Sequence, residues 1–554
     1  MVLQLLWNRG LRTQEQIDVF LHPDWSRDTH SPWLFAHMAE AVNRVFRALE
    51  NKEVITVHGD YDADGVCGTA VLVSTIRTLA KRLSLDPLLV TSYLPHREKE
   101  GYGVSVKTVE CLREQEKTSL LITVDCGISN GPALNRGHEL GMEAIVCDHH
   151  AMPEALPESA ILIHPLVPGE TYPNKHLCGT GVAFKFACAL IEEARKRGAD
   201  CAEGMEKWLL DLVAIATVTD IMPLSGENRT LESYGLLVLN KTRRLGLRRL
   251  LDIAGVKKGA ADVFTIGFQI GPRLNAAGRM SHANAALQLL LEEDETKARA
   301  LAEELQRTNT ARQHASEAVY QEARRVLESQ KDDKLLIAIG DDWPAGLVGL
   351  VASKIVNECY KPVLVIGKTE EGYVGSGRSV EGFSIMSVLH AAAPALAKFG
   401  GHPQACGFSI IGDEKLEQAV ILMKAHAESQ AMDASLVPRL KIDAEAPLDQ
   451  MDWDLYGALE AFAPFGEGNP RPLFCARRLE VYGMDAVGND GKHLRLTVRS
   501  PRGKLWKLIG FRLGDWLPKL RLGQLLDIAY EAGVNDWNGH RELQFKISDL
   551  KFSE

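Results

Sequence analysis

A run of acidic residues directly follows a short β-branched segment near the start of the chain. Residues 54–57 read Val-Ile-Thr-Val, which is typical of a buried parallel strand. The segment is followed by His58, Asp60, Asp62 and Asp64. Three carboxylates at alternate positions repel one another strongly unless a cation lies among them. The pattern therefore predicts a metal site, while a solvated acidic turn is the alternative that this stretch alone leaves open.

Similar polar residues follow three other predicted elements, two strands and a helix. They are Asp125 after residues 121–124, Asp148, His149 and His150 after residues 144–147, and Asp220 after residues 208–219. Open α/β sheets bind ligands at the carboxyl ends of their strands, so we expect these side chains to converge. Mixed histidine and aspartate sets suit manganese and also accept magnesium, zinc or iron. Two such ions about 3.5–4 Å apart form a site that cleaves phosphoesters.

The elements that position these residues alternate between strands and helices from residue 54 onward. This order is typical of a parallel sheet wrapped by helices. Residues 294–330 contain no glycine or proline and predict a long connecting helix. A second α/β pattern begins at residue 335, and short alternating strands after residue 438 predict a five-stranded barrel of the OB type. The predicted fold class is therefore α/β, with a parallel-sheet domain joined by the long helix to a second α/β domain, followed by the barrel.

The composition is that of a globular protein with several domains. The chain has 554 residues, 45% of them hydrophobic, and is too long for one core. It has no export signal, and no apolar run approaches the roughly 20 residues that span a membrane. Its ten cysteines include no C-x-x-C pair, which favours reduced thiols. We therefore expect a cytoplasmic protein without a membrane partner.

The net charge of −10 argues against a nucleic-acid partner, but the local distribution of charge matters more. Residues 476–521 hold eleven Lys or Arg against four Asp or Glu, interleaved with aromatic residues. Basic and aromatic residues on a barrel suit the binding of single strands, although the aromatics could equally form the core of the barrel. The candidate nucleic-acid contacts in this segment are Arg495, Trp506, Lys507 and Arg512.

Two further regions carry groups that bind anions. Residues 271–280 read G-P-R-L-N-A-A-G-R-M, which we interpret as a turn that forms an anion cradle. Residues 375–379 and 400–407 are glycine-rich, which lets backbone amides approach a phosphate. The side chains that would contact the anion are Arg273, Asn275 and Arg279 in the first region, and Ser376 and Arg378 in the second.

The motifs D-Y-D-A-D-G, V-D-C-G and D-H-H, with the later isolated aspartate, resemble those of the DHH phosphoesterase superfamily in order and spacing. The resemblance implies two divalent ions, Mn2+ or Mg2+. It implies that His150 faces the scissile phosphate, while Asp60 and Asp148 orient the catalytic residues. The implied ligands are His58, Asp62 and Asp125 for one ion, and Asp64, Asp125, His149 and Asp220 for the other.

Residues 271–280 also resemble a segment of the RecJ single-strand exonucleases, one branch of this superfamily. The glycine-rich stretches resemble the G-S-x-R-S and G-G-H-x-x-A-x-G signatures of the domain that accompanies DHH domains. This resemblance implies that Arg97, Arg279 and Arg378 contact the 5′-phosphate or the backbone, and that His402 lies near the substrate. The implied domains are an N-terminal helical extension (1–50), a DHH domain (51–293), a connecting helix (294–330), a DHH-associated domain (331–434) and an OB domain (435–554).

The resemblance covers roughly residues 50–550 and implies a single-strand-specific DNA exonuclease that degrades from the 5′ end with two metal ions. It also implies a role in recombination and repair beside a helicase and a single-strand-binding protein. One alternative is an oligoribonuclease or phosphodiesterase of the same superfamily that acts on short oligonucleotides, but these relatives lack the basic barrel. Another is a non-catalytic replication scaffold, which can lose its metal ligands, whereas every ligand position is filled here.

Overall fold

The computed structural model describes residues 1–430, 438–537 and 540–554. The chain forms two compact units, one of residues 31–220 with 235–438 and one of residues 1–30 with 221–234 and 439–554. Among the described residues, no helix is both long enough and apolar enough to cross a membrane. The predicted boundary between residues 434 and 435 lies outside the described residues, so the division into five domains stays a prediction.

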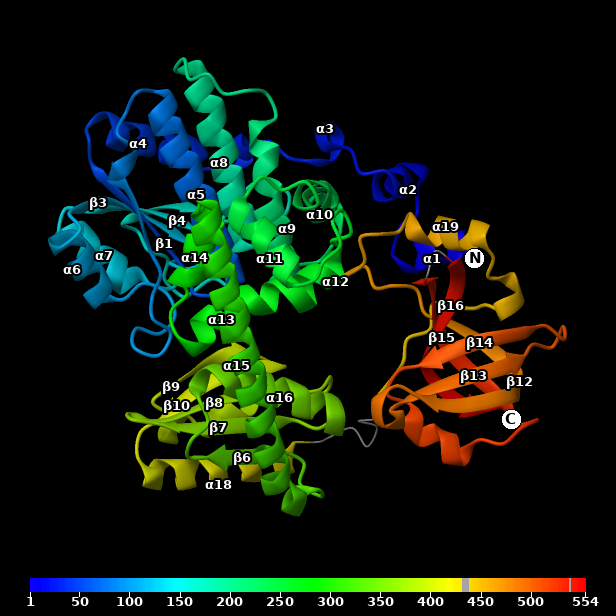
Figure 1. Cartoon of the computed structure of the whole chain (residues 1–554). Coiled ribbons are helices and arrows are strands. Elements are labelled where there is room, and N and C mark those ends of the chain that lie inside the picture. The colour runs from blue at the N-terminus through cyan, green and yellow to red at the C-terminus, as the bar shows by residue number, and fades with distance from the viewer. Residues whose placement is uncertain (431–437, 538–539) are drawn as a thin grey trace. The chain divides into compact units, whose positions relative to one another are not determined.

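The larger unit begins with a five-stranded sheet in which every pairing is parallel, as predicted. The strand order is β2-β1-β3-β4-β5. Figure 1 shows α5 and α8 on one side of this sheet and α6 and α7 on the other. The carboxyl ends of β1, β3 and β4 therefore share one edge. The bounds are β1 Val54–Gly59, β2 Val90–Tyr93, β3 Thr118–Val124, β4 Glu143–Cys147, β5 Ala160–Ile163, α5 Ala63–Arg82, α6 Val106–Glu114, α7 Gly131–Glu139 and α8 Gly179–Lys196.

Residues 271–280 form a helix, α13, and not the predicted turn. Pro272 lies in its first turn, where a missing N–H costs nothing, and Leu274, Ala276 and Ala277 are buried. Alanine and leucine favour helix, so this interior pattern outweighs the flanking glycines. The neighbouring helices are α4 Met38–Glu50, α9 Leu210–Thr219, α10 Gly226–Leu239, α11 Leu245–Ile253, α12 Val263–Thr265, the π-helical segment Ile266–Ile270, α13 Gly271–Met280 and α14 Asn284–Leu291.

The long connecting helix is confirmed as α15, Glu295–Leu327, and leads into a second sheet of order β6-β7-β8-β10-β9. The glycine-rich stretches are antiparallel strands of this sheet and not loops. A Cβ atom on Gly375 would lie 2.1 Å from the Phe408 ring, so packing between strands requires this glycine. The bounds are β6 Leu336–Gly340, β7 Val363–Thr369, β8 Gly372–Arg378, β9 Lys398–His402, β10 Ala405–Ile410, α16 Ala345–Cys359, α17 Ile385–Ala391 and α18 Asp413–Ser429.

The smaller unit contains the predicted OB-type barrel. Its five strands pair in the order β12-β13-β14-β16-β15, and an additional pairing of β12 with β15 closes the barrel. Only the contact of β14 with β16 is parallel among these five pairings. The bounds are β11 Ala444–Glu445, α19 Trp453–Glu460, β12 Phe474–Val487, β13 His493–Arg499, β14 Leu505–Gly510, β15 Leu525–Trp537 and β16 His540–Phe552.

The first thirty residues belong to the unit that holds the barrel, whereas α4 packs on the parallel sheet. Leu5, Leu6 and Phe20 are buried in the core of the smaller unit. The Phe20 ring meets the edge of Phe462 at 5.5 Å, and Arg229 donates a 2.7 Å hydrogen bond to the Phe20 carbonyl. The first fifty residues are thus shared between the two units. The helices here are α1 Val2–Asn8, α2 Gln14–Leu21 and α3 Trp25–Asp28.

Glu232 on α10 gives the smaller unit a pH-dependent stability. Its side chain is fully buried, and neither carboxylate oxygen has a hydrogen-bond partner among the described residues. Burial raises the pKa of Glu232 well above its ordinary value of 4.5. The folded protein therefore holds this proton more tightly than the unfolded chain does. Its contribution to stability is full below pH 4.5 and is lost as the pH rises toward the folded pKa.

We therefore expect Glu232→Gln to gain stability relative to the parent protein as the pH rises. The gain should grow between pH 4.5 and about pH 8, because over this range the folded parent protein holds a proton that the unfolded chain releases. Urea unfolding at both pH values measures the gain. Glu304→Gln, on the exposed face of α15, is the control and should show none. A difference between Glu232→Gln and parent that does not vary with pH would contradict the assignment.

Candidate metal centre and nucleic-acid contacts

The carboxyl ends of three strands and one helix carry the predicted donors. Asp62 caps α5, where its Oδ1 accepts hydrogen bonds from the amides of Asp64 at 3.0 Å and Gly65 at 3.2 Å. Asp125 follows β3 with a φ of +60°, a left-handed conformation that turns the chain sharply at the edge of the sheet. Asp220 caps the end of α9, so a helix rather than a strand supplies this donor.

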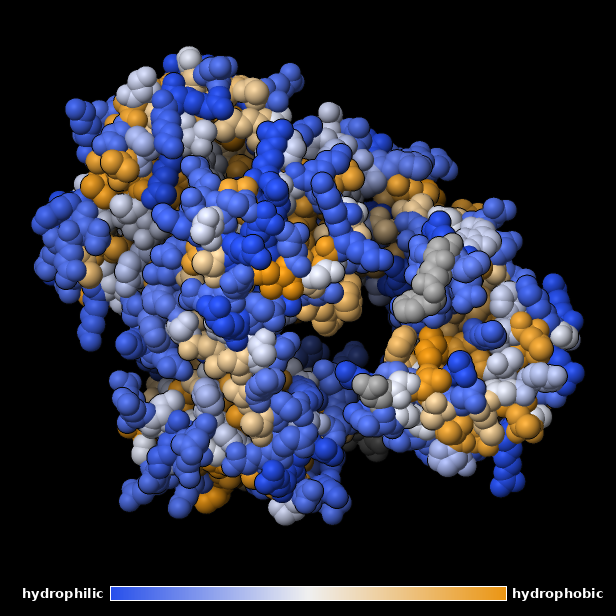
Figure 2. Space-filling model, in the orientation of Figure 1, coloured by the Kyte–Doolittle hydropathy of each residue, from blue (hydrophilic) through white to orange (hydrophobic). Residues whose placement is uncertain are grey.

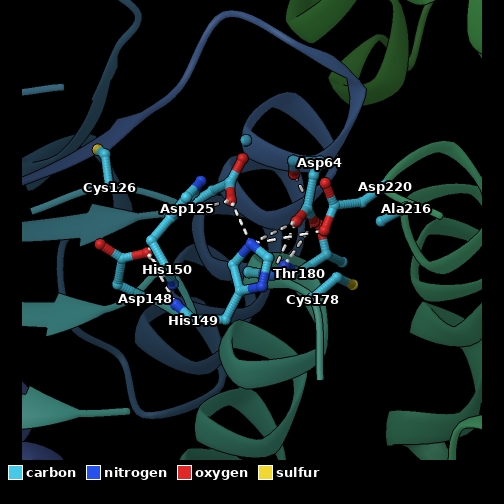
Figure 3. Close-up of polar contacts among 12 residues, drawn as sticks. Asp64, Asp125, Cys126, Asp148, His149, His150, Cys178, Thr180, Ala216 and Asp220 are labelled. Atoms are coloured by element: carbon cyan, nitrogen blue, oxygen red, sulfur yellow. Dashed lines mark hydrogen bonds and ion pairs between the residues drawn. The ribbon is translucent and has the colours of Figure 1, made fainter. Parts of the chain in front are cut away.

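Three of the predicted ligands meet around the imidazole of a fourth, His149 (Figure 3). The Nε2 atom of His149 lies 3.1 Å from Asp125 Oδ1, 3.5 Å from Asp220 Oδ2 and 3.8 Å from Asp64 Oδ2. Three groups of potential ligand atoms are found here, and they share residues. Within each group, all ligand atoms lie within 4.8 Å of one another. They are Asp125 with His149 and His150, Asp64 with His149 and Asp220, and Asp60 with Asp62 and Asp125. Asp125 is shared by two groups, and Asp60, for which the resemblance implied an orienting role, belongs to the third group with Asp62 and Asp125.

His58 lies outside these three groups, although it is the first histidine of the predicted set. Its ring is buried, and burial lowers its pKa to about 4. The Nδ1 atom lies 3.8 Å from Cys126 Sγ, while Nε2 has no hydrogen-bond partner among the described residues. A neutral imidazole with one engaged nitrogen presents the other as a metal ligand. Nε2 is thus the atom that His58 offers.

The electrostatics of the cluster fit a pair of divalent cations. Burial, and then the neighbouring carboxylates, raise the pKa values of Asp60, Asp62 and Asp125 above their ordinary range. The same causes raise the pKa of Asp220 to about 9. Asp60 Oδ1 and Asp220 Oδ2 are buried without a hydrogen-bond partner in the described chain. Cations would remove both the repulsion and the unsatisfied atoms, and oxygen and imidazole donors are those that Mn2+ accepts.

Helix α8 supports this cluster through residues that the motifs did not identify. The amides of Gly179 and Thr180 each donate a 2.7 Å hydrogen bond to a different oxygen of Asp64. A Cβ atom on Gly179 would lie 2.6 Å from the Cβ of Asp125, so only glycine fits between the two aspartates. The segment C-G-T-G at residues 178–181 was the available sequence signal, but it is also common in helix packing.

Asp148 contacts His150, and the resemblance implies that Asp148 orients it. Its Oδ1 lies 2.7 Å from His150 Nδ1 and accepts the amide of His149 at 2.7 Å. Burial opposes ionisation of Asp148, but the hydrogen bond and charge of His150 hold its pKa below the ordinary value. Burial likewise disfavours the imidazolium of His150, yet the hydrogen bond with Asp148 raises its pKa overall. His150 therefore carries positive charge more readily than a free histidine.

Tyr102 is a further residue of the centre. Its hydroxyl donates a 3.0 Å hydrogen bond to the carbonyl oxygen of Asp125 and lies 3.0 Å from His150 Nδ1. It therefore holds the left-handed turn at Asp125 and contacts the histidine expected to face the substrate. The sequence G-Y-G at residues 101–103 indicates a loop that either contacts a phosphate or a base or is a plain surface loop.

Three arginines gather beside the Asp62 loop. Burial lowers the pKa of Arg279 to about 10, and the nearby charges of Arg97 and Arg312 add to the effect. The Arg97 guanidinium lies 4.7 Å from the Tyr61 ring centre, and Arg312 on α15 donates to Asn309 Oδ1 at 3.0 Å. None of the three forms an ion pair in the part of the chain described here. Like charges held close together without a direct ion pair are the arrangement that an anionic ligand stabilises.

The other members of the predicted anion cradle have structural contacts. Asn275 Oδ1 accepts the amide of Ala63 at 2.7 Å and so fixes the start of α5. Arg273 donates to the Gln269 carbonyl at 2.6 Å and to Gln306 Oε1 at 2.9 Å, away from the arginine group. Only Arg279 of this segment therefore belongs to the group of three arginines, and Arg312 on the connecting helix is the member that the sequence did not indicate.

In the second α/β domain, Arg378 and Ser376 lie together. Arg378 Nη1 donates a 3.0 Å hydrogen bond to Ser376 Oγ, and its Nε donates to Ser353 Oγ at 3.1 Å. Arg378 has no carboxylate partner in the described residues, and burial lowers its pKa. Both side chains are thus held in place and can donate hydrogen bonds to a phosphate. His402 ends β9 as an exposed residue, and nothing in its surroundings assigns it a role.

The barrel candidates divide into inward and outward residues. Trp506 packs on the core, where its Nε1 donates to Asp449 Oδ1 at 2.8 Å and its ring meets Phe545. Arg495 pairs with Asp485 at 2.9 Å, whereas Lys507 and Arg512 have no ion pair within the described chain. Two aromatics present open faces instead. Tyr482 is 55% exposed beside Arg499, and Phe511 is 53% exposed beside His493.

Comparison with known proteins agrees with this architecture. Residues 54–217 match the DHH family, N-terminal domain, residues 332–429 match the DHHA1 domain, and residues 442–549 match the RecJ OB domain. The single-stranded-DNA-specific exonuclease RecJ of Bacillus subtilis is 34% identical over 557 residues, covering 100% of this chain and 68% of that protein. RecJ of Haemophilus influenzae is 31% identical, covering 92% of this chain and 90% of that protein.

Solved structures show the same similarity. The crystal structure of RecJ from Thermus thermophilus in complex with Mn2+ matches with a TM-score of 0.82 and 30% identity. That match covers 100% of this chain and 76% of the other chain. A second crystal structure, of exonuclease RecJ bound to manganese, matches with a TM-score of 0.62 and 33% identity, covering 73% of this chain and 98% of that one.

Proposed function

Because this chain belongs to the RecJ exonuclease family, we propose that it hydrolyses single-stranded DNA from the 5′ end with the help of two divalent cations. The observation that carries the proposal is the convergence of Asp64, Asp125 and Asp220 on one histidine. An inactive scaffold would have no reason to keep mutually repelling carboxylates buried together. A short-oligonucleotide phosphodiesterase would have no use for the barrel and its exposed aromatics.

The centre assigns a role to each group of residues. The cations, Mn2+ or Mg2+, supply an activated water and neutralise negative charge when they are bound. The expected ligands are His58, Asp62, Asp64, Asp125, His149 and Asp220. His150, held by Asp148 and biased toward its charged form, faces the scissile phosphate and stabilises the charge that develops there. Tyr102 maintains this geometry through its contact with the backbone of Asp125.

The proposed polarity rests on the family resemblance, and the arginines offer residues that would bind the 5′ end. Arg97, Arg279 and Arg312 lie beside the Asp62 loop and form no ion pair among the described residues, so we assign them to a terminal phosphate. Arg378 with Ser376 offers a second phosphate contact from the other α/β domain. A terminal 5′-phosphate carries more charge than an internal one and would gain most from this group. This assignment makes the 5′ end the starting point of degradation.

The reaction that tests this function uses the whole protein with Mn2+ and end-labelled DNA. Single strands labelled at the 5′ end should release labelled mononucleotide first, and duplexes of the same sequence should remain intact. Release of label from the 3′ end first would overturn the polarity. Equal degradation of the duplex would overturn the strand specificity, and no release from any strand would remove the function altogether.

The expected partners are a helicase and a single-strand-binding protein. An enzyme restricted to single strands depends on another protein to open a duplex, which is the basis for proposing the helicase. A protein that coats single strands would share the substrate and meet the enzyme on it. Co-purification of each with the intact chain, in the presence and absence of DNA, would distinguish direct contact from shared binding to the strand.

The exposed aromatics of the barrel give a separate prediction about affinity. Each base stacked on an aromatic ring contributes about 1–3 kcal/mol, so Tyr482→Ala with Phe511→Ala should weaken the binding of long single strands at least about tenfold. Hydrolysis of trinucleotides should be unchanged because they are too short to need the barrel. Fluorescence anisotropy measures the first effect. Leu522→Ala, at an equally exposed position in the same unit, is the control, and equal losses would contradict a stacking role.

A further inference from the structure

An exposed aromatic pair lies on the larger unit, next to the metal centre. Phe264 of α12 is 59% exposed and Phe268 of the π-helical segment is 70% exposed. Their rings stack with centres 4.7 Å apart and planes 26° apart. Figure 2 shows an apolar patch on a largely hydrophilic face where Figure 1 labels α12. Two large aromatics so exposed cost free energy in water and mark a surface that binds something.

The pair is tied to the metal centre by close backbone packing. A Cβ atom on Gly271, at the start of α13, would lie 2.5 Å from Thr219 Cγ2, and Thr219 immediately precedes Asp220. A Cβ atom on Gly267 would lie 3.7 Å from Val218 Cγ1 in the same helix. The segment that carries Phe268 therefore rests directly on the end of α9 that supplies a metal ligand. A shift of this segment would therefore displace the end of α9, and a shift of α9 would displace the segment.

Helix α13 also fixes the direction in which a strand would run. At its far end, Gly278 packs on Tyr61, where a Cβ atom would lie 2.4 Å from the carbonyl oxygen, and Arg279 follows. The ten residues of α13 span about 15 Å. One end of the helix therefore lies beside the arginines assigned to the terminal phosphate, and the other lies beside Asp220 and the aromatic pair. A strand that enters the arginines and crosses the centre would reach Phe264 and Phe268 next.

We propose that Phe264 and Phe268 form a stacking platform for bases on the 3′ side of the scissile phosphate. Flat aromatic faces accept any base, which suits an enzyme that cuts without regard to sequence. Exposed Lys257 and Lys258 lie just before the pair in the chain and have no ion pair within the described residues, so they complement a phosphate backbone. The assignment rests on the proposed function and specifies how the substrate is held there.

The test measures binding as a function of strand length, in buffer with EDTA so that nothing is cleaved. Dissociation constants are compared for 5′-phosphorylated oligothymidylates of three to about twenty nucleotides. The variants are the double replacements Phe264→Ala with Phe268→Ala and Phe264→Leu with Phe268→Leu, the latter keeping apolar bulk without a flat face. Ile421→Ala on α18, 67% exposed, is the control for loss of an exposed apolar side chain.

Both double variants should bind trinucleotides like the parent protein and should lose about tenfold in affinity once the strand is long enough to reach the pair. Ile421→Ala should follow the parent at every length. Curves that coincide at all lengths would overturn the platform. A leucine variant that keeps full affinity would also overturn it, since an apolar contact with a protein would then explain the patch. A loss of affinity that is already present with the trinucleotide would overturn it as well. Failure of the parent to cleave any strand with Mn2+ would refute the proposed function instead.

Discussion

Asp125→Asn is expected to lower kcat for single-strand cleavage at least about a thousandfold, which corresponds to about 4 kcal/mol of transition-state stabilisation. Asp125 is the carboxylate that belongs to two of the overlapping donor groups, so its loss weakens both expected ion sites together. Binding of single strands to the barrel should persist, because that surface lies in the other unit. Cleavage assays with Mn2+ and anisotropy with labelled strands measure the two effects separately.

The same variant should be more stable than the parent in EDTA. Because the pKa of Asp125 is raised, folding favours its neutral form, and an uncharged replacement removes the free-energy cost of keeping it protonated at neutral pH. Asparagine also tolerates the left-handed φ of +60° at this position. A higher melting temperature with lost activity would show that the fold is intact. Near-normal activity, or inactivity with a lowered melting temperature, would contradict the assignment.

Asp148→Asn is the matched comparison within the same centre. Asp148 contacts the His150 ring and three backbone amides, and it does not belong to any of the donor groups found among the described residues. Its replacement should cost activity by about 10–100-fold, as is usual for residues that orient ligands or catalytic groups. A loss as deep as that of Asp125→Asn would mean that Asp148 takes part in metal binding directly.

The sequence predicted most of the centre because of a general property of parallel sheets. Asp125 and Asp148 follow strands that are adjacent in the sheet, and the carboxyl ends of parallel strands must share an edge. No further information is needed to bring those residues together. Asp220 reached the same place from the end of a helix, and only its resemblance to a known motif indicated that it belongs with them.

The residues that sequence reasoning missed act through contacts between distant segments. Gly179 is needed because Asp125 lies against its backbone, and Arg312 joins Arg279 because the connecting helix packs beside α13. Neither requirement leaves a local pattern. The glycine-rich stretches form strands for the same kind of reason, since Gly375 makes room for a ring on a neighbouring strand. Local sequence patterns thus predicted the helices and strands, whereas packing between distant segments determined the roles of several individual residues.

Binding of Mn2+ to the metal-free protein is expected to release protons and to raise stability in a pH-dependent way. Asp60, Asp62, Asp125 and Asp220 have raised pKa values, so the metal-free centre retains protons near pH 7. A cation displaces them because it favours the ionised carboxylates. Calorimetry in two buffers of different ionisation enthalpy counts the released protons, and their number should fall as the pH approaches about 9, the pKa of Asp220.

The stability of the metal-free protein should change in the opposite direction from that of a protein with depressed carboxylate pKa values. Groups whose folded pKa is raised contribute fully below the unfolded pKa, and their contribution is lost as the pH rises toward the folded value. The metal-free protein should therefore lose stability between about pH 4 and pH 9. Saturation of two sites at about 100 times their dissociation constants should restore roughly 5 kcal/mol at neutral pH. The gain in stability should be smaller in Asp125→Asn than in the parent protein. A rise in melting temperature without proton release would place the bound ions outside this cluster, and so would a rise of equal size in that variant.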